Sequence, residues 1–260
     1  MIFIMKIKFA VRSEIGRVRT NNEDNFFCNG IYMTVSERER PFFMNGGADV
    51  PCVFAVCDGM GGEDCGELAS LTAVETLKIH ASDIKRNIKG VNEFIIDANH
   101  KICEIMKSEN LRMGTTLAFA VAYDKSFMLY NIGDSRIYRL EKNRLVRVSN
   151  DHTLAEDKVR MGLITPEKAE KDRDRHVLTR YLGIFEDEFV VEPDEYGPFD
   201  YGTNKRILLC SDGLTEMLDY NSIALIMMKS ADVSEAVNNL VNSALNNGGR
   251  DNITCIVLEA

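Results

Sequence analysis

Short apolar segments of four to seven residues, bounded by Gly, Asn or Asp, recur through this chain of 260 residues and constrain its fold. Segments of this length are typical of buried β-strands, because strands are shorter than helices and end at turn-forming residues. The sequences at 123–126 and 141–143 predict hairpin turns. Strands are predicted near 6–12, 25–33, 52–58, 115–123, 126–132, 135–140, 144–148, 189–192, 206–210 and 252–258.

Two pairs of predicted helices interrupt the strands, each with apolar residues at helical spacing. The first pair covers about 63–81 and 91–107, and the second covers about 222–229 and 234–246. Strands followed by two helices, then more strands and two more helices, indicate an α+β protein. Its sheets would be covered by helical layers.

Residues 150–180 differ from the rest of the chain in being mostly polar. They contain a predicted helix at 154–161 and a charged run from Lys171 to Arg175. Such a segment is typical of a mobile surface insertion, but a plain solvated face would have the same composition.

Acidic residues stand at the ends of several predicted strands. A carboxylate at the end of a buried strand has lost much of its water and needs a cation to compensate. Several such carboxylates, if they converge, repel one another unless hard metal ions lie between them. Each taken alone can be explained as a turn cap, but five sites together favour a metal centre. They are Glu23-Asp24, Asp58, Asp134, Asp212 and Asp251.

Composition excludes other classes of protein. The formal net charge of -9, with no basic stretch to offset it, argues against nucleic-acid binding. The seven cysteines contain no Cys-x-x-Cys pair, which favours reduced thiols in a cytoplasmic protein over disulfides or a zinc site. The apolar opening at residues 1–5 is too short for a signal peptide, and no stretch approaches the ~20 apolar residues of a membrane span.

Seven short motifs follow one another along the chain. They are Arg19-x-x-Asn22-Glu23-Asp24-Asn25, Asp58-Gly59-Met60-Gly61-Gly62, Gly114-Thr115-Thr116, Gly133-Asp134-Ser135-Arg136, Leu178-Thr179-Arg180-Tyr181-Leu182-Gly183, Ser211-Asp212-Gly213-Leu214 and Gly249-Arg250-Asp251-Asn252-Ile253-Thr254. In this order the motifs resemble the metal-dependent serine/threonine protein phosphatases of the PP2C (PPM) family, and the single-domain bacterial branch is the most similar. The resemblance runs from about Arg12 to Leu258. A cysteine phosphatase would need Cys-x₅-Arg, which is absent.

The resemblance implies a four-layer α/β/β/α sandwich, in which two antiparallel β-sheets are flanked by helix pairs. It implies one phosphatase domain over residues 1–260, with 150–180 as a mobile, flap-like insertion. This architecture agrees with the two helix pairs predicted from the apolar spacing.

The resemblance also implies two core divalent cations and a weaker third. Asp58 would bridge the two core ions, Asp212 and Asp251 would complete the first, and Asp134 with Asp212 would hold the third. For the second core ion it implies the carbonyl of Gly59, Glu23 acting through a water, and Asp24 in support. Oxygen ligands of this kind suit Mn²⁺ or Mg²⁺, and two such ions can lower the pKa of a shared water.

By the same resemblance, Arg19 would bind the substrate phosphate with its planar guanidinium group. The implied reaction is metal-dependent hydrolysis of phosphoserine and phosphothreonine in proteins, by a monomer that opposes a Hanks-type kinase. Met60 follows Asp58-Gly59 where eukaryotic members carry a histidine, so the residue that protonates the leaving group is left open. The alternative is a pseudophosphatase that binds phosphoproteins without turnover.

Overall fold

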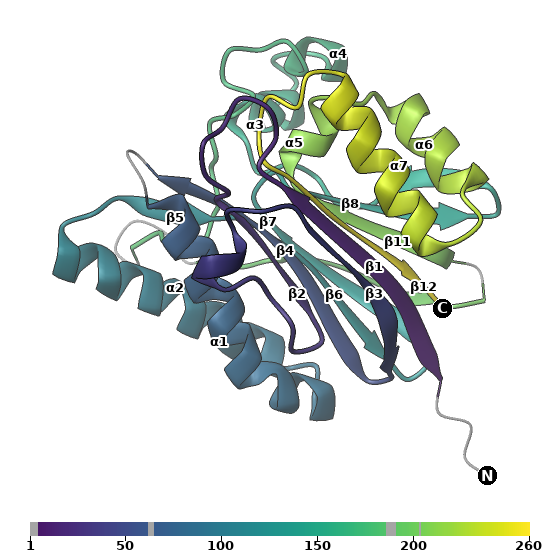
Figure 1. The fold of residues 1–260 in the computed structure, drawn as a ribbon. Helices are drawn as coiled ribbons and strands as arrows, with labels where there is room; N and C mark the ends of the chain where they lie inside the picture. Colours follow the sequence, from purple (N-terminus) through teal and green to yellow (C-terminus); the bar gives the residue numbers. More distant parts are fainter. Residues whose placement is uncertain (1–4, 62–64, 186–190, 203) are drawn as a thin grey trace.

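The computed structural model describes residues 5–61, 65–185, 191–202 and 204–260 and contains two antiparallel six-stranded sheets (Figure 1). The first sheet has the order β3 (Phe42–Asp49), β1 (Lys6–Glu14), β12 (Ile253–Glu259), β11 (Asn204–Cys210), β8 (Arg136–Glu141) and β9 (Arg144–Arg147). The second has the order β10 (Asp194–Asp200), β7 (Ser126–Ile132), β6 (Leu117–Tyr123), β4 (Cys52–Gly61) and β2 (Asp24–Cys28), with β5 (Met113–Thr115) paired to β4.

A pair of long helices covers the outer face of each sheet (Figure 1). Helices α1 (Gly66–Arg86) and α2 (Gly90–Glu109) pack on the second sheet, and α6 (Tyr220–Lys229) and α7 (Val233–Asn246) pack on the first. The predicted four-layer α/β/β/α sandwich is confirmed. Among the described residues, no helix combines the length and the apolar character needed to span a bilayer.

The apolar core forms three layers, and the alternation of side chains in β4 shows how one strand serves two of them. Val53 and Ala55 face the helices α1 and α2, whereas Phe54 and Val56 face the other sheet. All four side chains are fully buried, and burying a side chain the size of Phe54 stabilises the fold by about 2 kcal/mol. Strand β4 therefore packs against the helices α1 and α2 on one face and against the first sheet on the other.

Both predicted hairpins are present. Tyr123 pairs with Ser126, and Glu141 pairs with Arg144, so each loop has two residues. Lys142 and Asn143 both have positive φ, as the tight turns that match the twist of antiparallel strands require.

Several predicted boundaries were wrong. The strand expected at 25–33 ends at Cys28, because Asn29 and Gly30 turn the chain with φ of 50° and 114°. Of the strand expected at 189–192, residues 189–190 lie outside the described residues, and 191–192 are not in a strand; β10 begins at Asp194. The helix start expected at Glu63 also lies outside them, and α1 is described from Gly66. Strand β3 was not predicted.

Residues 150–180 form a compact segment beside the end of the sandwich where the short helix α5 (Asp212–Thr215) lies (Figure 1). The segment contains α3 (Leu154–Arg160) and α4 (Pro166–Ala169). Its two ends are joined by backbone hydrogen bonds from Leu154 N–H to Val177 C=O and from Thr179 N–H to His152 C=O. The segment is therefore a closed excursion from the sheets.

Candidate active site

The first two predicted acidic residues lie side by side at one end of the second sheet. Asp24, at the start of β2, is directly opposite Asp58, near the end of β4. The hydroxyl of Ser211 donates a hydrogen bond of 2.8 Å to Asp24 Oδ2, whereas the buried Asp24 Oδ1 has no hydrogen-bond partner among the described residues. Strand pairing thus brings two carboxylates together with less hydrogen bonding than they could accept.

Asp134 is tied to Asp58 through a short hydroxyl chain. The backbone N–H of Asp58 donates to Thr116 Oγ1 at 3.0 Å, and Thr116 Oγ1 lies 2.6 Å from the hydroxyl of Ser135. Asp134 is the residue between Gly133 and Ser135 in the loop from β7 to β8. Thr116, the second threonine of the Gly-Thr-Thr motif, therefore links the segments of Asp58 and Asp134, which are 76 positions apart in the sequence.

Asp212 and Asp251 complete the cluster from the first sheet. Asp212 is the first residue of α5 and the second after β11, and Asp251 is the second residue before β12. Asp251 Oδ1 accepts a hydrogen bond from the N–H of Asn252, and the side chain of Asn252 accepts one from the N–H of Glu23. Neighbouring strands of both sheets thus end at the same place, so carboxylates far apart in sequence converge.

The electrostatics show how strongly these groups interact. Burial, followed by the charges of Asp24, Asp212, Asp134 and Asp251, raises the pKa of Asp58 well above its usual range. The pKa of Asp134 is raised in the same way, by burial and by the charge of Asp212. Burial raises the pKa values of Asp24 and Asp212 to about 7. Mutual repulsion in a partly dry site disfavours the ionised carboxylates.

Gly59 and Glu23 meet the N-terminal end of α1. A Cβ atom built on Gly59 would overlap the carbonyl oxygen of Gly66 and lie 2.5 Å from that of Glu23, so this position has room for glycine alone. The N–H of Gly59 donates to the Glu23 carbonyl at 3.2 Å. Burial raises the pKa of Glu23, and the charge of Arg19 opposes that shift.

Arg19 lies at the rim of the cluster, with its side chain 48% exposed. Its Nη2 atom donates to Asp251 Oδ2 at 2.8 Å. That hydrogen bond raises the pKa of Arg19 above its usual value, so the guanidinium stays charged and reachable from solvent.

The structure adds His176, which was not among the predicted site residues. One ligand atom each from His176, Asp134 and Asp212 lie within 4.8 Å of one another. His176 Nε2 also lies 3.0 Å from Glu216 Oε1, just after α5. Its place in the polar segment 150–180 was the available signal, but nothing in the sequence showed that the segment folds back over Asp212.

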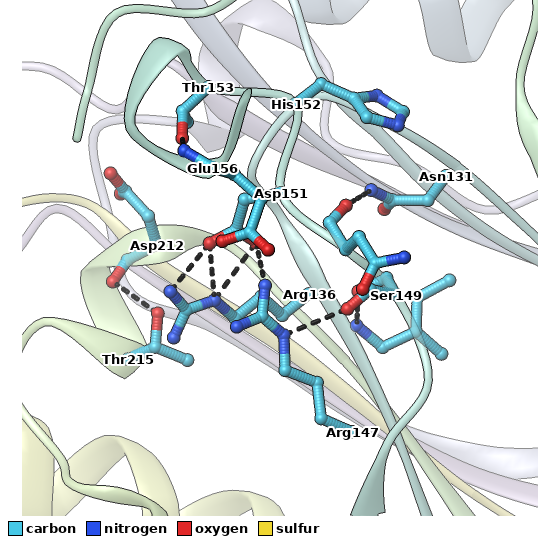
Figure 2. Close-up of polar contacts among 12 residues, drawn as sticks. Asn131, Arg136, Arg147, Ser149, Asp151, His152, Thr153, Glu156, Asp212 and Thr215 are labelled. Atoms are coloured by element: carbon cyan, nitrogen blue, oxygen red, sulfur yellow. Dashed lines mark hydrogen bonds and ion pairs between the residues drawn. The ribbon is translucent and has the colours of Figure 1, made fainter. Parts of the chain in front are cut away.

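The segment 150–180 is attached to the first sheet by a charged cluster close to Asp212 (Figure 2). Asp151 accepts from Arg136 at 2.7 Å and forms an ion pair of 2.5 Å with Arg147. A cavity of about 1000 Å³ extends from Asp134, Asp212 and His176 beneath the segment, and these arginines also line it. The cavity and the carboxylate cluster are therefore continuous.

The carboxylate cluster fits divalent cations. Its donors are almost all oxygen atoms, which suits Mg²⁺ or Mn²⁺. Arg19 pairs with Asp251, but the raised pKa values of Asp58 and Asp134 and the unpaired Asp24 Oδ1 indicate that the described side chains do not neutralise these other three carboxylates. Positive charge placed among the carboxylates would remove the repulsion.

Comparison with known proteins identifies the class. The family model for protein phosphatase 2C matches residues 42–248. The serine/threonine phosphatase stp of Listeria welshimeri is 32% identical over 260 residues, covering 95% of this chain and 94% of its own. The crystal structure of Mycobacterium tuberculosis PstP/Ppp has a TM-score of 0.82 and 30% identity, covering 98% of this chain and 99% of that one.

The chain therefore belongs to the protein phosphatase 2C family. A second structure is that of the PstP catalytic domain in complex with two manganese ions, with a TM-score of 0.78 and 29% identity. It covers 98% of this chain and 99% of its own.

Proposed function

We propose that this chain, a serine/threonine protein phosphatase, hydrolyses phosphoserine and phosphothreonine in proteins with the help of Mn²⁺ or Mg²⁺. The convergence of Asp58, Asp134, Asp212 and Asp251 on one partly buried site is the observation that carries the proposal. The manganese ions of the PstP catalytic domain support the choice of metal. Proteins phosphorylated by a cognate serine/threonine kinase are the proposed substrates.

Asp58, Asp212 and Asp251 would hold the first core cation, and Asp58, the Gly59 carbonyl and Glu23 would hold the second, with Asp24 in support. Asp134 and Asp212 would hold a weaker third. When bound, the ions lower the pKa of a water for attack at phosphorus and neutralise charge on the phosphate. The chain's own part is to fix these oxygens: Thr116 holds Asp58 and Ser135 together, and Ser211 holds Asp24.

Metal dependence tests the proposal. Release of phosphate from a phosphothreonine peptide should require Mn²⁺ or Mg²⁺ and stop in EDTA. It should survive thiol alkylation of the folded protein, because all seven cysteines are buried. Full activity in chelator would contradict the metal mechanism. Binding of the peptide without any phosphate release, with Mn²⁺ present, would identify a pseudophosphatase.

Arg19→Ala should raise KM about tenfold or more while kcat changes only a few-fold. Arg19 is exposed at the rim and would contact the phosphate before the reaction, so its loss removes ground-state binding. One charge-assisted hydrogen bond contributes about 1.5–3 kcal/mol, and each 1.4 kcal/mol is about tenfold in affinity. Arg19→Lys, which keeps the charge without the planar fork, should fall between. A loss confined to kcat would contradict this role.

We also propose that residues 150–180 act as a flap that selects protein substrates, within a single phosphatase domain. The segment covers a cavity continuous with the carboxylate cluster and is held to the first sheet through Asp151. Replacing 154–175 with a relative's segment should change the preference among phosphoproteins. Turnover of p-nitrophenyl phosphate should stay within about threefold. An equal collapse of both activities would make the segment structural.

A further inference from the structure

Gly133, the residue before Asp134, is held by the segment at the start of the proposed flap. Its N–H donates to His152 Nδ1 at 3.1 Å, and its carbonyl accepts from the N–H of His152 at 3.0 Å. The carbonyl also accepts from Asn131 Nδ2 at 3.1 Å. Three hydrogen bonds therefore fix both polar groups of one peptide residue beside the cluster.

Position 133 requires a glycine, and the hydrogen bonds around it restrict the flexibility that glycine brings. Its φ is +96°, and a Cβ atom there would lie 2.7 Å from the methyl group of Thr116, so glycine is required. Glycine alone is also the most flexible residue. The contacts from His152 and Asn131 therefore supply the rigidity that glycine lacks.

His152 is buried, with only 3% of its surface exposed, although it lies in a mainly polar segment. Because Nδ1 accepts a hydrogen bond, the proton of the ring must be on Nε2. Nε2 lies 3.3 Å from Asp194 Oδ2 of β10. Asp194 in turn accepts from Arg180 at 2.8 Å, at the other end of the flap. One nitrogen of the ring therefore faces Gly133, and the other faces Asp194.

We propose that His152 is a positioning residue for Asp134: its Nδ1 atom holds the N–H of Gly133, the residue before Asp134, and so sets the affinity of the weaker cation site. This inference rests on the proposed role of Asp134 as a cation ligand. The contacts of His152 described above are with Gly133 and Asp194, so it would act on Asp134 through the backbone. It acts as groups behind a metal ligand do, whose loss typically lowers metal affinity about 10–100-fold.

Two isosteric variants separate the contacts of His152. The Oδ1 atom of Asn occupies the place of Nδ1, so His152→Asn keeps an acceptor for Gly133 and loses the contact with Asp194. The amide nitrogen of Gln reaches the place of Nε2, so His152→Gln keeps the donor toward Asp194 and loses the acceptor for Gly133. Each variant removes one of the two contacts of the ring, the hydrogen bond with Gly133 or the 3.3 Å approach to Asp194, while leaving a polar side chain in its pocket.

Calorimetric titration with Mn²⁺ of the full chain, its two His152 variants and Asp134→Ala tests the inference. We expect Asp134→Ala to remove the weakest binding event. His152→Gln should weaken that event about tenfold, and His152→Asn should stay within about threefold of the wild type. Binding at the two tighter sites should be unchanged in all three variants, which also shows that they are folded.

Equal weakening by the Asn and Gln variants, or no weakening by either while Asp134→Ala removes the event, would overturn the positioning role of His152 alone. Unchanged Mn²⁺ binding in Asp134→Ala would overturn the role of Asp134 as a ligand and the inference with it. If the weakest Mn²⁺-binding event is retained in His152→Asn but lost in His152→Gln, the result would support both the positioning role of His152 and the role of Asp134 as a ligand.

Discussion

Asp58→Asn should remove nearly all phosphatase activity and, without metal, make the folded protein more stable. Asp58 is the proposed bridge between the two core cations, and Asn supplies only one neutral oxygen where a carboxylate supplies two. Removing a residue that hydrogen-bonds to a metal ligand typically lowers metal affinity or activity about 10–100-fold. Loss of a direct ligand should therefore reduce kcat by more than about 100-fold. Glu23→Gln, acting through water, should cost less.

The stabilisation has a separate cause. Burial, followed by the charges of four neighbouring carboxylates, raises the pKa of Asp58, which means that its ionised form is disfavoured in the folded protein. Asn has the same shape without the charge, and the backbone contacts of residue 58 with Thr116 remain. Relief of about 1 kcal/mol would raise Tm by roughly 2–4 °C for a chain of this size.

Scanning calorimetry with and without Mn²⁺ separates these effects. At a metal concentration of 100 times Kd, the wild type should gain about 2.7 kcal/mol, or roughly 5–10 °C, and Asp58→Asn should gain far less. Asp49→Asn is a matched control, since Asp49 is exposed at the end of β3 and should change neither activity nor the response to Mn²⁺. A metal-free Asp58→Asn protein less stable than the wild type would contradict the repulsion account.

Gly59→Ala should have the second largest effect, through packing. The added Cβ overlaps the backbone carbonyl of Gly66 and approaches that of Glu23, and backbone atoms cannot rotate away as a side chain can. Overpacking of this kind costs about 1–3 kcal/mol, which lowers Tm by roughly 2–12 °C. Displacing Glu23 and the Gly59 carbonyl would also weaken metal binding, so activity should fall at least about tenfold.

Gly47→Ala provides the comparison for Gly59→Ala. A Cβ at Gly47, in β3, meets its nearest atoms only at 3.9 Å, so the same added methyl group should leave Tm and kcat close to the wild type. If Gly59→Ala behaved like Gly47→Ala in thermal unfolding and in phosphopeptide hydrolysis, the close approach of β4 to α1 would have no role in shaping the site.

The fold was predictable where local patterns and packing agree. Strand β7, predicted at 126–132, has those bounds in the structure, because its apolar run is buried and ends at turn residues. Strand β3 was missed because its sequence contains Asn45-Gly46-Gly47 and it lies exposed at a sheet edge. Strand β10 was misplaced because Gly197-Pro198 interrupts it, with a shift in register there.

The acidic residues of the candidate site could be picked out from the sequence, but the way they assemble could not. Strand ends marked Asp58, Asp212 and Asp251 as carboxylates that needed a cation, and the structure brings them together as their mutual effects on pKa show. The position of His176 beside Asp134 and Asp212 could not be predicted, since it depends on how residues 150–180 fold back against α5. Such a contact depends on tertiary packing and leaves no periodic signal in the sequence.

Anomalous diffraction from a crystal grown with Mn²⁺ tests the central claim most directly. We predict two strong anomalous peaks from manganese ions that both contact Asp58. One of these ions should also contact Asp212 and Asp251, and the other should contact the Gly59 carbonyl. A weaker third peak should lie between Asp134 and Asp212. An Asp58→Asn crystal grown in the same way should lose the two strong peaks. A wild-type crystal whose manganese ions lie elsewhere, with Asp58 free of metal in an enzyme that hydrolyses phosphopeptides, would contradict the account.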